Sequence, residues 1–128
     1  KGTIRGMHFQ LPPTTESKII ICTKGKVFDV AVDVRKKSKT YLKYVSLNLS
    51  SEINNMILIP KGFAHGFQTL SDDVELIYFH DHSYSPEFEK SINPLDPLIN
   101  INWPIQNKII SKKDKSTKIL SENNFKGI

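Results

Sequence analysis

The sequence has little cysteine and no long apolar run, and each absence excludes a class of protein. Its 128 residues contain one cysteine, Cys22, which excludes an internal disulfide and a cysteine-rich zinc site. No apolar run approaches the ~18 residues that a membrane-spanning helix needs. The segment Lys1–Gln10 also lacks the apolar stretch of a secretory signal. We therefore expect a protein of the reducing cytoplasm, with no membrane partner.

Size and charge narrow the choice of partner. A chain of this length buries one core, so we predict a single domain over residues 1–128, with a tail from about residue 116. The 18 basic residues outnumber the 13 acidic ones, which favours an anionic partner. They are mostly scattered lysines, without an Arg-rich helix or an aromatic stacking motif, so we do not expect nucleic acid. The dense run Lys112–Lys115 is either a solvated tail or a segment that folds back onto a site.

Period-two alternation predicts strands throughout the chain. In Lys26–Val34, Phe28 and alternate valines share one face, while Asp29 and Asp33 lie on the other. The same pattern predicts strands over Lys18–Thr23, Lys43–Leu49, Asn55–Ile59, Phe63–Leu70 and Val74–His80. Turn residues recur every ~8–12 residues, which is typical of an all-β sandwich or barrel.

The sequence pattern predicts different structures at the two ends of the chain. After Pro97 the pattern becomes irregular, and we predict a frayed tail or a short helix over Ser116–Ile128. The first residues already lie in a predicted strand, so we expect further strands upstream in a longer protein. Without such strands, a sheet edge and an apolar face would be exposed, and the chain would associate through that edge.

Histidines and one tyrosine are the candidate chemical groups. His65 lies between Phe63 and Phe67 on one strand face, so it is either a core residue or lines an apolar cavity. His80 and His82 would share a strand face and could supply two metal ligands, or they mark an exposed strand end. Tyr78, on a mostly apolar face, is either a core residue or a general acid.

Four parts of the chain together resemble the dTDP-4-dehydrorhamnose 3,5-epimerase family, from Lys1 to about Leu120. They are Gly2–Gln10, Lys18, Gly25–Asp33 and Ile59–Phe67. The resemblance implies a double-stranded β-helix, a jelly roll of the cupin type, that works as a homodimer without metal or cofactor. It also implies inversion of carbons 3 and 5 in a 4-keto-6-deoxy sugar joined to a nucleotide diphosphate.

The resemblance assigns five catalytic roles. His8 is the base that takes a proton beside the ketone, and Asp114 is its carboxylate partner. Lys18 and His65 stabilise negative charge on the keto oxygen. Tyr78 delivers a proton from the opposite face, as inversion requires.

The resemblance also assigns substrate contacts and leaves one question open. Arg5, Glu89 and Lys113 would hold the diphosphate and the sugar. His8 and Arg5 fall on opposite faces of a regular strand, so either a bulge at Gly6 or two substrate regions must reconcile them.

Two departures from the family leave the base and the regiochemistry open. Ser83 stands where many members carry a tyrosine that stacks on thymine, and Tyr84 is adjacent. The segment Asn93–Pro97 has the form found in relatives that act on modified deoxysugars, so inversion at a single carbon is open.

Three hypotheses follow. The first is a cofactor-independent epimerase, because a base and an acid are both present. The second is a non-catalytic module on the same barrel that binds a sugar nucleotide or a carbohydrate. The third is a metal-dependent cupin enzyme that uses His80 and His82.

Overall fold

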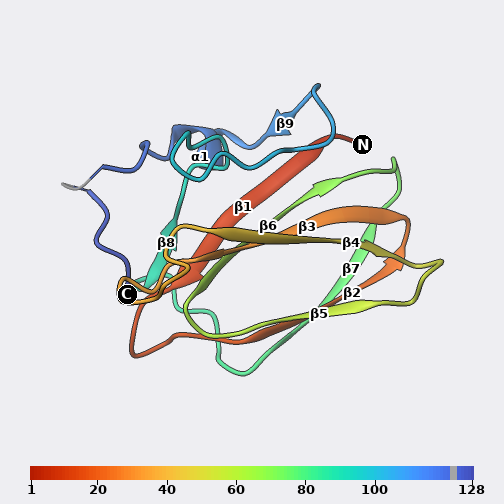
Figure 1. The fold of residues 1–128 in the computed structure, drawn as a ribbon. Helices are drawn as coiled ribbons and strands as arrows, with labels where there is room; N and C mark the ends of the chain where they lie inside the picture. The colour runs from red at the N-terminus through yellow and green to blue at the C-terminus, as the bar shows by residue number, and fades with distance from the viewer. Residues whose placement is uncertain (122–123) are drawn as a thin grey trace.

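The computed structural model describes residues 1–121 and 124–128, and these are built almost entirely of strands (Figure 1). The elements are β1 Thr3–Gln10, β2 Lys18–Lys24, β3 Lys26–Asp33, β4 Tyr44–Ser50, β5 Met56–Ile59, β6 Phe63–Thr69, β7 Glu75–His80, β8 Glu89–Ser91, β9 Ile109–Ile110 and α1 Lys112–Ser116. Each strand predicted from alternation forms within one residue of its expected ends, whereas β8 and β9 were not predicted. In the described residues no helix is long and apolar enough to span a bilayer.

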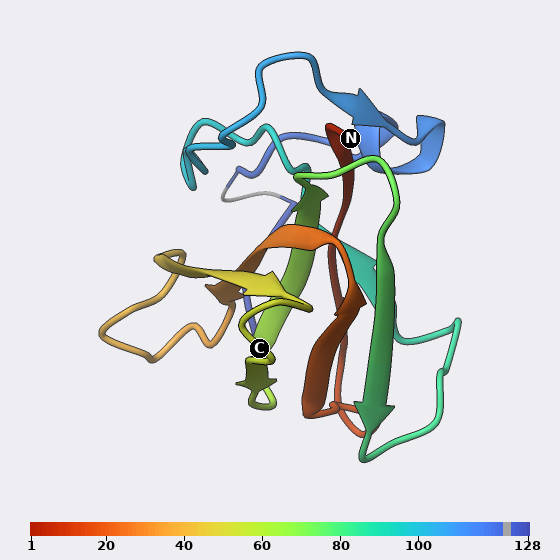
Figure 2. The ribbon, with the colours of Figure 1, turned by 90° about the vertical axis from the view of Figure 1, so that its right-hand side faces the viewer.

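Two sheets face each other, as Figures 1 and 2 show from perpendicular directions. The larger has the order β4-β3-β6-β1-β8, with β9 beside β1, and the smaller has the order β5-β2-β7. This arrangement confirms the predicted all-β jelly roll of the cupin type. The site described below lies where β1 and β6 of the larger sheet face β2 and β7 of the smaller one.

Strand β3 contributes to two cores because both of its faces are buried. Val27 and Ala31 pack between the sheets with Ile20 and Ile59. The alternate valines pack on the opposite face in a second core, which also contains Trp103 and Leu120. Each fully buried aliphatic side chain contributes roughly 1.5–3 kcal/mol. The second core therefore holds the C-terminal third of the chain against the larger sheet.

The residues after α1 pack against the sheet, so the prediction of a frayed tail or a helix there is wrong. The helix comes earlier and contains the lysine run itself. Phe125 packs edge-on against Phe9, with ring centroids 6.1 Å apart. The amide of Ile128 donates to the Val34 carbonyl at 2.8 Å. The prediction also covered residues 122–123, which lie outside the described part of the chain.

Strand β1 lies inside the larger sheet, between β6 and β8. The first strand is therefore not itself a sheet edge, and the expected association through an edge left open by missing upstream strands stays a prediction. Its pairing with β6 shifts register between Arg5 and His8. Gly6, at this shift, has φ of +120° and packs directly on the Gly66 backbone, where a Cβ would collide. The expected bulge at Gly6 is thus present, and it brings Arg5 and His8 to the same cavity.

Candidate active site

A cavity of about 340 Å³, here called the main cavity, opens between the two sheets. Its lining consists of Arg5, His8, Lys18, His65, Gly66, Phe67, Tyr78 and His80. Two adjoining hollows share His8 with it, one lined by Lys113 and Asp114 and the other by Glu89. All eight site residues expected from the sequence therefore gather around His8.

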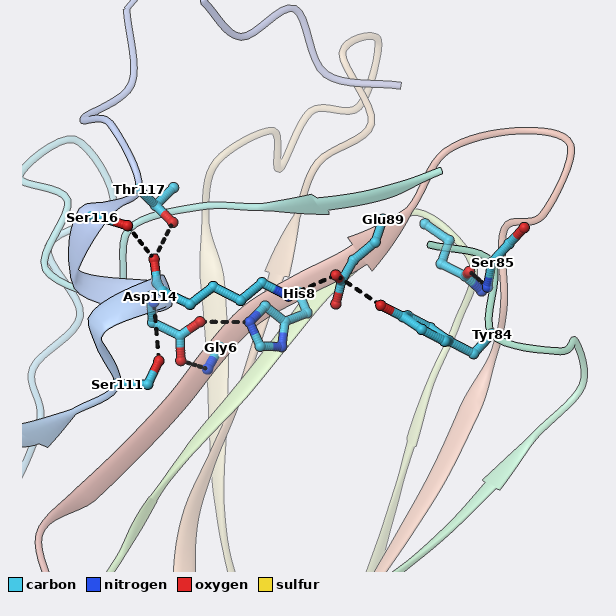
Figure 3. A network of polar contacts seen from close by, with 11 residues as sticks. Gly6, His8, Tyr84, Ser85, Glu89, Ser111, Asp114, Ser116 and Thr117 are labelled. Carbon is cyan, nitrogen blue, oxygen red and sulfur yellow. Dashed lines mark hydrogen bonds and ion pairs between the residues drawn. The ribbon is translucent and has the colours of Figure 1, made fainter. Parts of the chain in front are cut away.

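The His8 ring is held by a carboxylate from the far end of the chain. Its Nε2 lies 2.7 Å from Oδ1 of Asp114, and Figure 3 shows the ring between Asp114 and Glu89. A carboxylate only accepts hydrogen bonds, so Nε2 carries the hydrogen and Nδ1 of the neutral ring keeps its lone pair. His8 is 31% exposed, whereas Asp114 is 4% exposed. A half-buried imidazole is thus paired with a buried, fixed carboxylate.

Local structure explains the position of Asp114. The Ser111 hydroxyl caps α1 by accepting from the Asp114 amide at 3.0 Å. Oδ2 of Asp114 accepts from the Gly6 amide at the bulge, at 3.4 Å. The Asn93 side chain donates to the Thr117 carbonyl at 2.7 Å, just past the end of the helix. These bonds hold a one-turn helix against β1.

His65 makes a second histidine–carboxylate pair, with Asp29. Its Nε2 lies 3.0 Å and 2.9 Å from the two carboxylate oxygens, and both side chains are buried. His65 is therefore a core residue that also lines the main cavity, which settles the alternative left open above. Asp29 was not among the predicted site residues. Its inward position on an apolar strand, beside the His65 strand, was the signal available in the sequence.

Lys18 lines the main cavity, and its ammonium group forms a buried ion pair. Its Nζ lies 3.0 Å from Oε1 of Glu16. The other oxygen of Glu16 lies 2.7 Å from Nδ1 of His80. Glu16 was not among the predicted site residues. His80 is the exposed strand end that was one of its two predicted alternatives, since β7 ends there and its side chain is 38% exposed, and it also lines the main cavity.

His80 and His82 do not share a strand face, so that prediction is wrong. Strand β7 ends at His80, and the His82 ring instead bonds the Ser83 carbonyl at 2.9 Å. Over residues 1–121 and 124–128, no group of three His, Cys, Asp or Glu side chains is arranged to hold a metal ion.

Tyr78 faces the main cavity from β7. Its ring meets His65 edge-on at 5.7 Å and stacks on His80 at 5.8 Å. Burial, and secondarily the negative charge of Asp29, raise the pKa of Tyr78, and the opposing effect of Arg5 is smaller. A phenol is protonated at neutral pH even at its ordinary pKa, and the raised pKa makes the Tyr78 hydroxyl a weaker acid than a free phenol.

A polar cluster flanks His8 on its other side. Glu89 accepts from Lys113 at 2.7 Å and from the Tyr84 hydroxyl at 3.1 Å (Figure 3). Partial burial works to raise the pKa of Glu89, but these two bonds and the nearby positive charges hold it below its usual value. The bond to Glu89 raises the pKa of Lys113. The cluster thus pairs a carboxylate anion with a lysine cation beside the candidate base.

The fold and the site define a cupin-type protein with groups for acid–base chemistry around one cavity. Comparison with known proteins gives the family. The family model described as dTDP-4-dehydrorhamnose 3,5-epimerase matches residues 1–122. A protein of that name from Shigella flexneri is 49% identical over 89% of this chain. The chain belongs to the dTDP-4-dehydrorhamnose 3,5-epimerase family.

Solved structures agree with this assignment. The epimerase from Elizabethkingia anophelis superposes with a TM-score of 0.92 at 36% identity, over 97% of this chain and 69% of that one. A Legionella pneumophila epimerase, solved in complex with dTDP-4-keto-L-rhamnose, gives 0.86 at 43% identity, over 93% of this chain and 63% of that one. This chain likewise spans 63% of the length of the Shigella flexneri protein.

Proposed function

We propose that this chain provides the catalytic site of an epimerase that inverts carbon 3, carbon 5 or both in a dTDP-linked 4-keto-6-deoxy sugar. The observation that carries the proposal is the pairing of His8 with Asp114 beside a cavity that also contains Tyr78. A base and an acid around one cavity are what removal and return of a proton require. The Legionella pneumophila relative, which binds such a keto sugar, supports this substrate class.

The first step is proton removal. A hydrogen on the carbon beside a ketone becomes acidic when the enolate oxygen is stabilised. Nδ1 of His8 takes this proton, and the electron pair of the C–H bond moves onto the keto oxygen. Asp114 then stabilises the imidazolium that forms. The Lys18 ammonium and His65 lie on the same cavity and stabilise the enolate oxygen.

The second step returns a proton to the other face of the same carbon. Tyr78 supplies it, because its phenol lines the cavity and carries a proton at neutral pH. His8 ends with one extra proton and Tyr78 with one fewer, and exchange with water restores both groups. Arg5 and Lys113, together with Glu89, line the adjoining hollows and hold the diphosphate and the sugar.

The partner proposed for this chain is a second copy of itself. The outward face of β5-β2-β7 is apolar, and Met56, Leu58, Ile77 and Phe79 are 58%, 63%, 42% and 57% exposed. Exposed apolar patches of this kind mark interaction surfaces. Light scattering tests the homodimer, and Leu58→Lys with Phe79→Lys should give a monomer. We also propose a cytoplasmic location, which suits the free, buried Cys22 and is tested by cell fractionation.

Incubation with dTDP-4-keto-6-deoxyglucose in heavy water tests the reaction. We expect deuterium at carbon 3, at carbon 5 or at both, and NMR of the recovered sugar identifies which. Tight binding of the sugar nucleotide without deuterium uptake would contradict the proposal and indicate a binding module. Activity that depends on added metal would indicate the metal-cupin alternative.

A further inference from the structure

His80 lines the main cavity, and Glu16 lines the adjoining hollow that also contains Glu89, but neither has a part in the steps above. Glu16 lies just before β2, and its side chain is only 8% exposed. One carboxylate oxygen contacts Nζ of Lys18 at 3.0 Å and the other contacts Nδ1 of His80 at 2.7 Å. A buried carboxylate is costly unless its oxygens are bonded, so the position of Glu16 depends on both partners.

We propose that Glu16 and His80 form a clamp that positions the Lys18 ammonium in the main cavity. The inference rests on the proposed function, because it explains how the ammonium is directed at the keto oxygen. A lysine side chain carries about 2 kcal/mol of rotamer entropy when it is free. The bond to Glu16 removes that freedom before substrate binds, and preorganised charge is what stabilises a developing oxyanion.

His80 holds the far side of the clamp. Its ring stacks on the Tyr78 ring with an interplanar angle of 16°, which fixes the plane of the imidazole. Because Nδ1 of His80 donates to the second carboxylate oxygen of Glu16, that oxygen does not compete for the Lys18 ammonium. Contacts through Glu16 and His80 therefore fix the position of the Lys18 ammonium on β2 relative to the Tyr78 phenol on β7.

The first test is Glu16→Gln, which keeps the shape of the side chain and removes its charge. The neutral amide removes the ion pair with Lys18, although its carbonyl can still accept from the ammonium and its NH2 can donate to the other tautomer of His80. Loss of a hydrogen bond to a charged group predicts that kcat for deuterium exchange falls about tenfold. The affinity for dTDP, measured by calorimetry, should stay at its wild-type value, because Glu16 acts only through Lys18, whereas the melting temperature should fall because a buried ion pair is broken.

The second test compares two replacements of His80. His80→Ala removes the donor and should lower kcat to the level of Glu16→Gln. His80→Asn places an amide nitrogen near the position of Nδ1 and should restore kcat to within about twofold, because one neutral donor replaces another. Asp81→Asn is the control: it makes the same charge change beside His80, but Asp81 is 46% exposed and pairs with Lys61 outside the cavity.

A chemical readout separates failure of the clamp from failure of the proposed reaction. Acetic anhydride labelling followed by peptide mass spectrometry reports how freely the Lys18 amine reacts. Labelling should rise about tenfold in Glu16→Gln, because the charged bond to Lys18 is lost, and should rise in His80→Ala and return in His80→Asn, because His80 holds Glu16 in place. Unchanged labelling in both variants would overturn the clamp. A wild-type protein without deuterium exchange would overturn the proposed reaction, while the labelling would still decide the clamp.

Discussion

The two histidine–aspartate pairs of the site have the same chemistry in different settings. His8 and Asp114 are 106 residues apart, and their single contact joins a half-buried ring to a helix of one turn. His65 and Asp29 come from adjacent strands, are buried, and meet through both carboxylate oxygens. The difference shows that the same two residue types serve different purposes in different surroundings. A ring with access to water can exchange protons with it, whereas a ring held in the core presents a fixed polar edge to the cavity.

The variant with the largest expected effect removes the solvent-accessible imidazole ring of His8. His8→Gln should lower deuterium exchange by ~10²–10⁴-fold, the usual cost of losing a general base. The melting temperature should change little, because the ring is half-buried and outside both cores. Exchange at the wild-type rate would show that another residue is the base.

Tyr78→Phe probes the acid that faces both histidines. Removing only the hydroxyl leaves the base in place, so deuterium entry should survive while net inversion falls by about 10². NMR of the recovered sugar measures both quantities in one sample. If both fall equally, Tyr78 serves binding or folding and the acid lies elsewhere.

Matched Asp→Asn variants compare how much each pair contributes to the free energy of unfolding. Asp29→Asn breaks a fully buried pair and should lower the free energy of unfolding by roughly 3 kcal/mol. Asp114→Asn should lower it by about 1 kcal/mol, because its histidine partner is 31% exposed and can bond water instead. Urea denaturation gives both values. Equal losses would mean that exposure of the histidine does not distinguish the pairs.

A carboxylate outside both pairs gives an effect on stability that depends on pH. Hydrogen bonds from Arg35, which outweigh the effect of burial, lower the pKa of Asp33 below its ordinary value of 3.8. Its stabilisation is therefore present above that pH and is lost as the pH falls further. Asp33→Asn should cost about 2 kcal/mol at neutral pH, and the gap to wild type should close progressively in acid below about pH 4. Urea denaturation across a pH series checks this, and a gap that persists in acid would argue against it.

Much of this architecture could be predicted from local pattern. Alternation identified β2 to β7, because each strand buries one face or both and the side-chain period of two is visible in the sequence. The short strands β8 and β9 carry too few residues to show a period. The segment after α1 was misjudged because its isolated apolar residues, such as Leu120 and Phe125, pack only once the sheet exists.

The sequence by itself determined the jelly roll and the family, since strand periodicity and short motifs are local properties. It also determined which residue types could move a proton. Only the tertiary structure decided that Asp29 bonds His65 and that Glu16 joins Lys18 to His80. The physical reason is that a carboxylate bonds whichever donors the fold brings within about 3 Å, and strand pairing and chain reversal set that proximity.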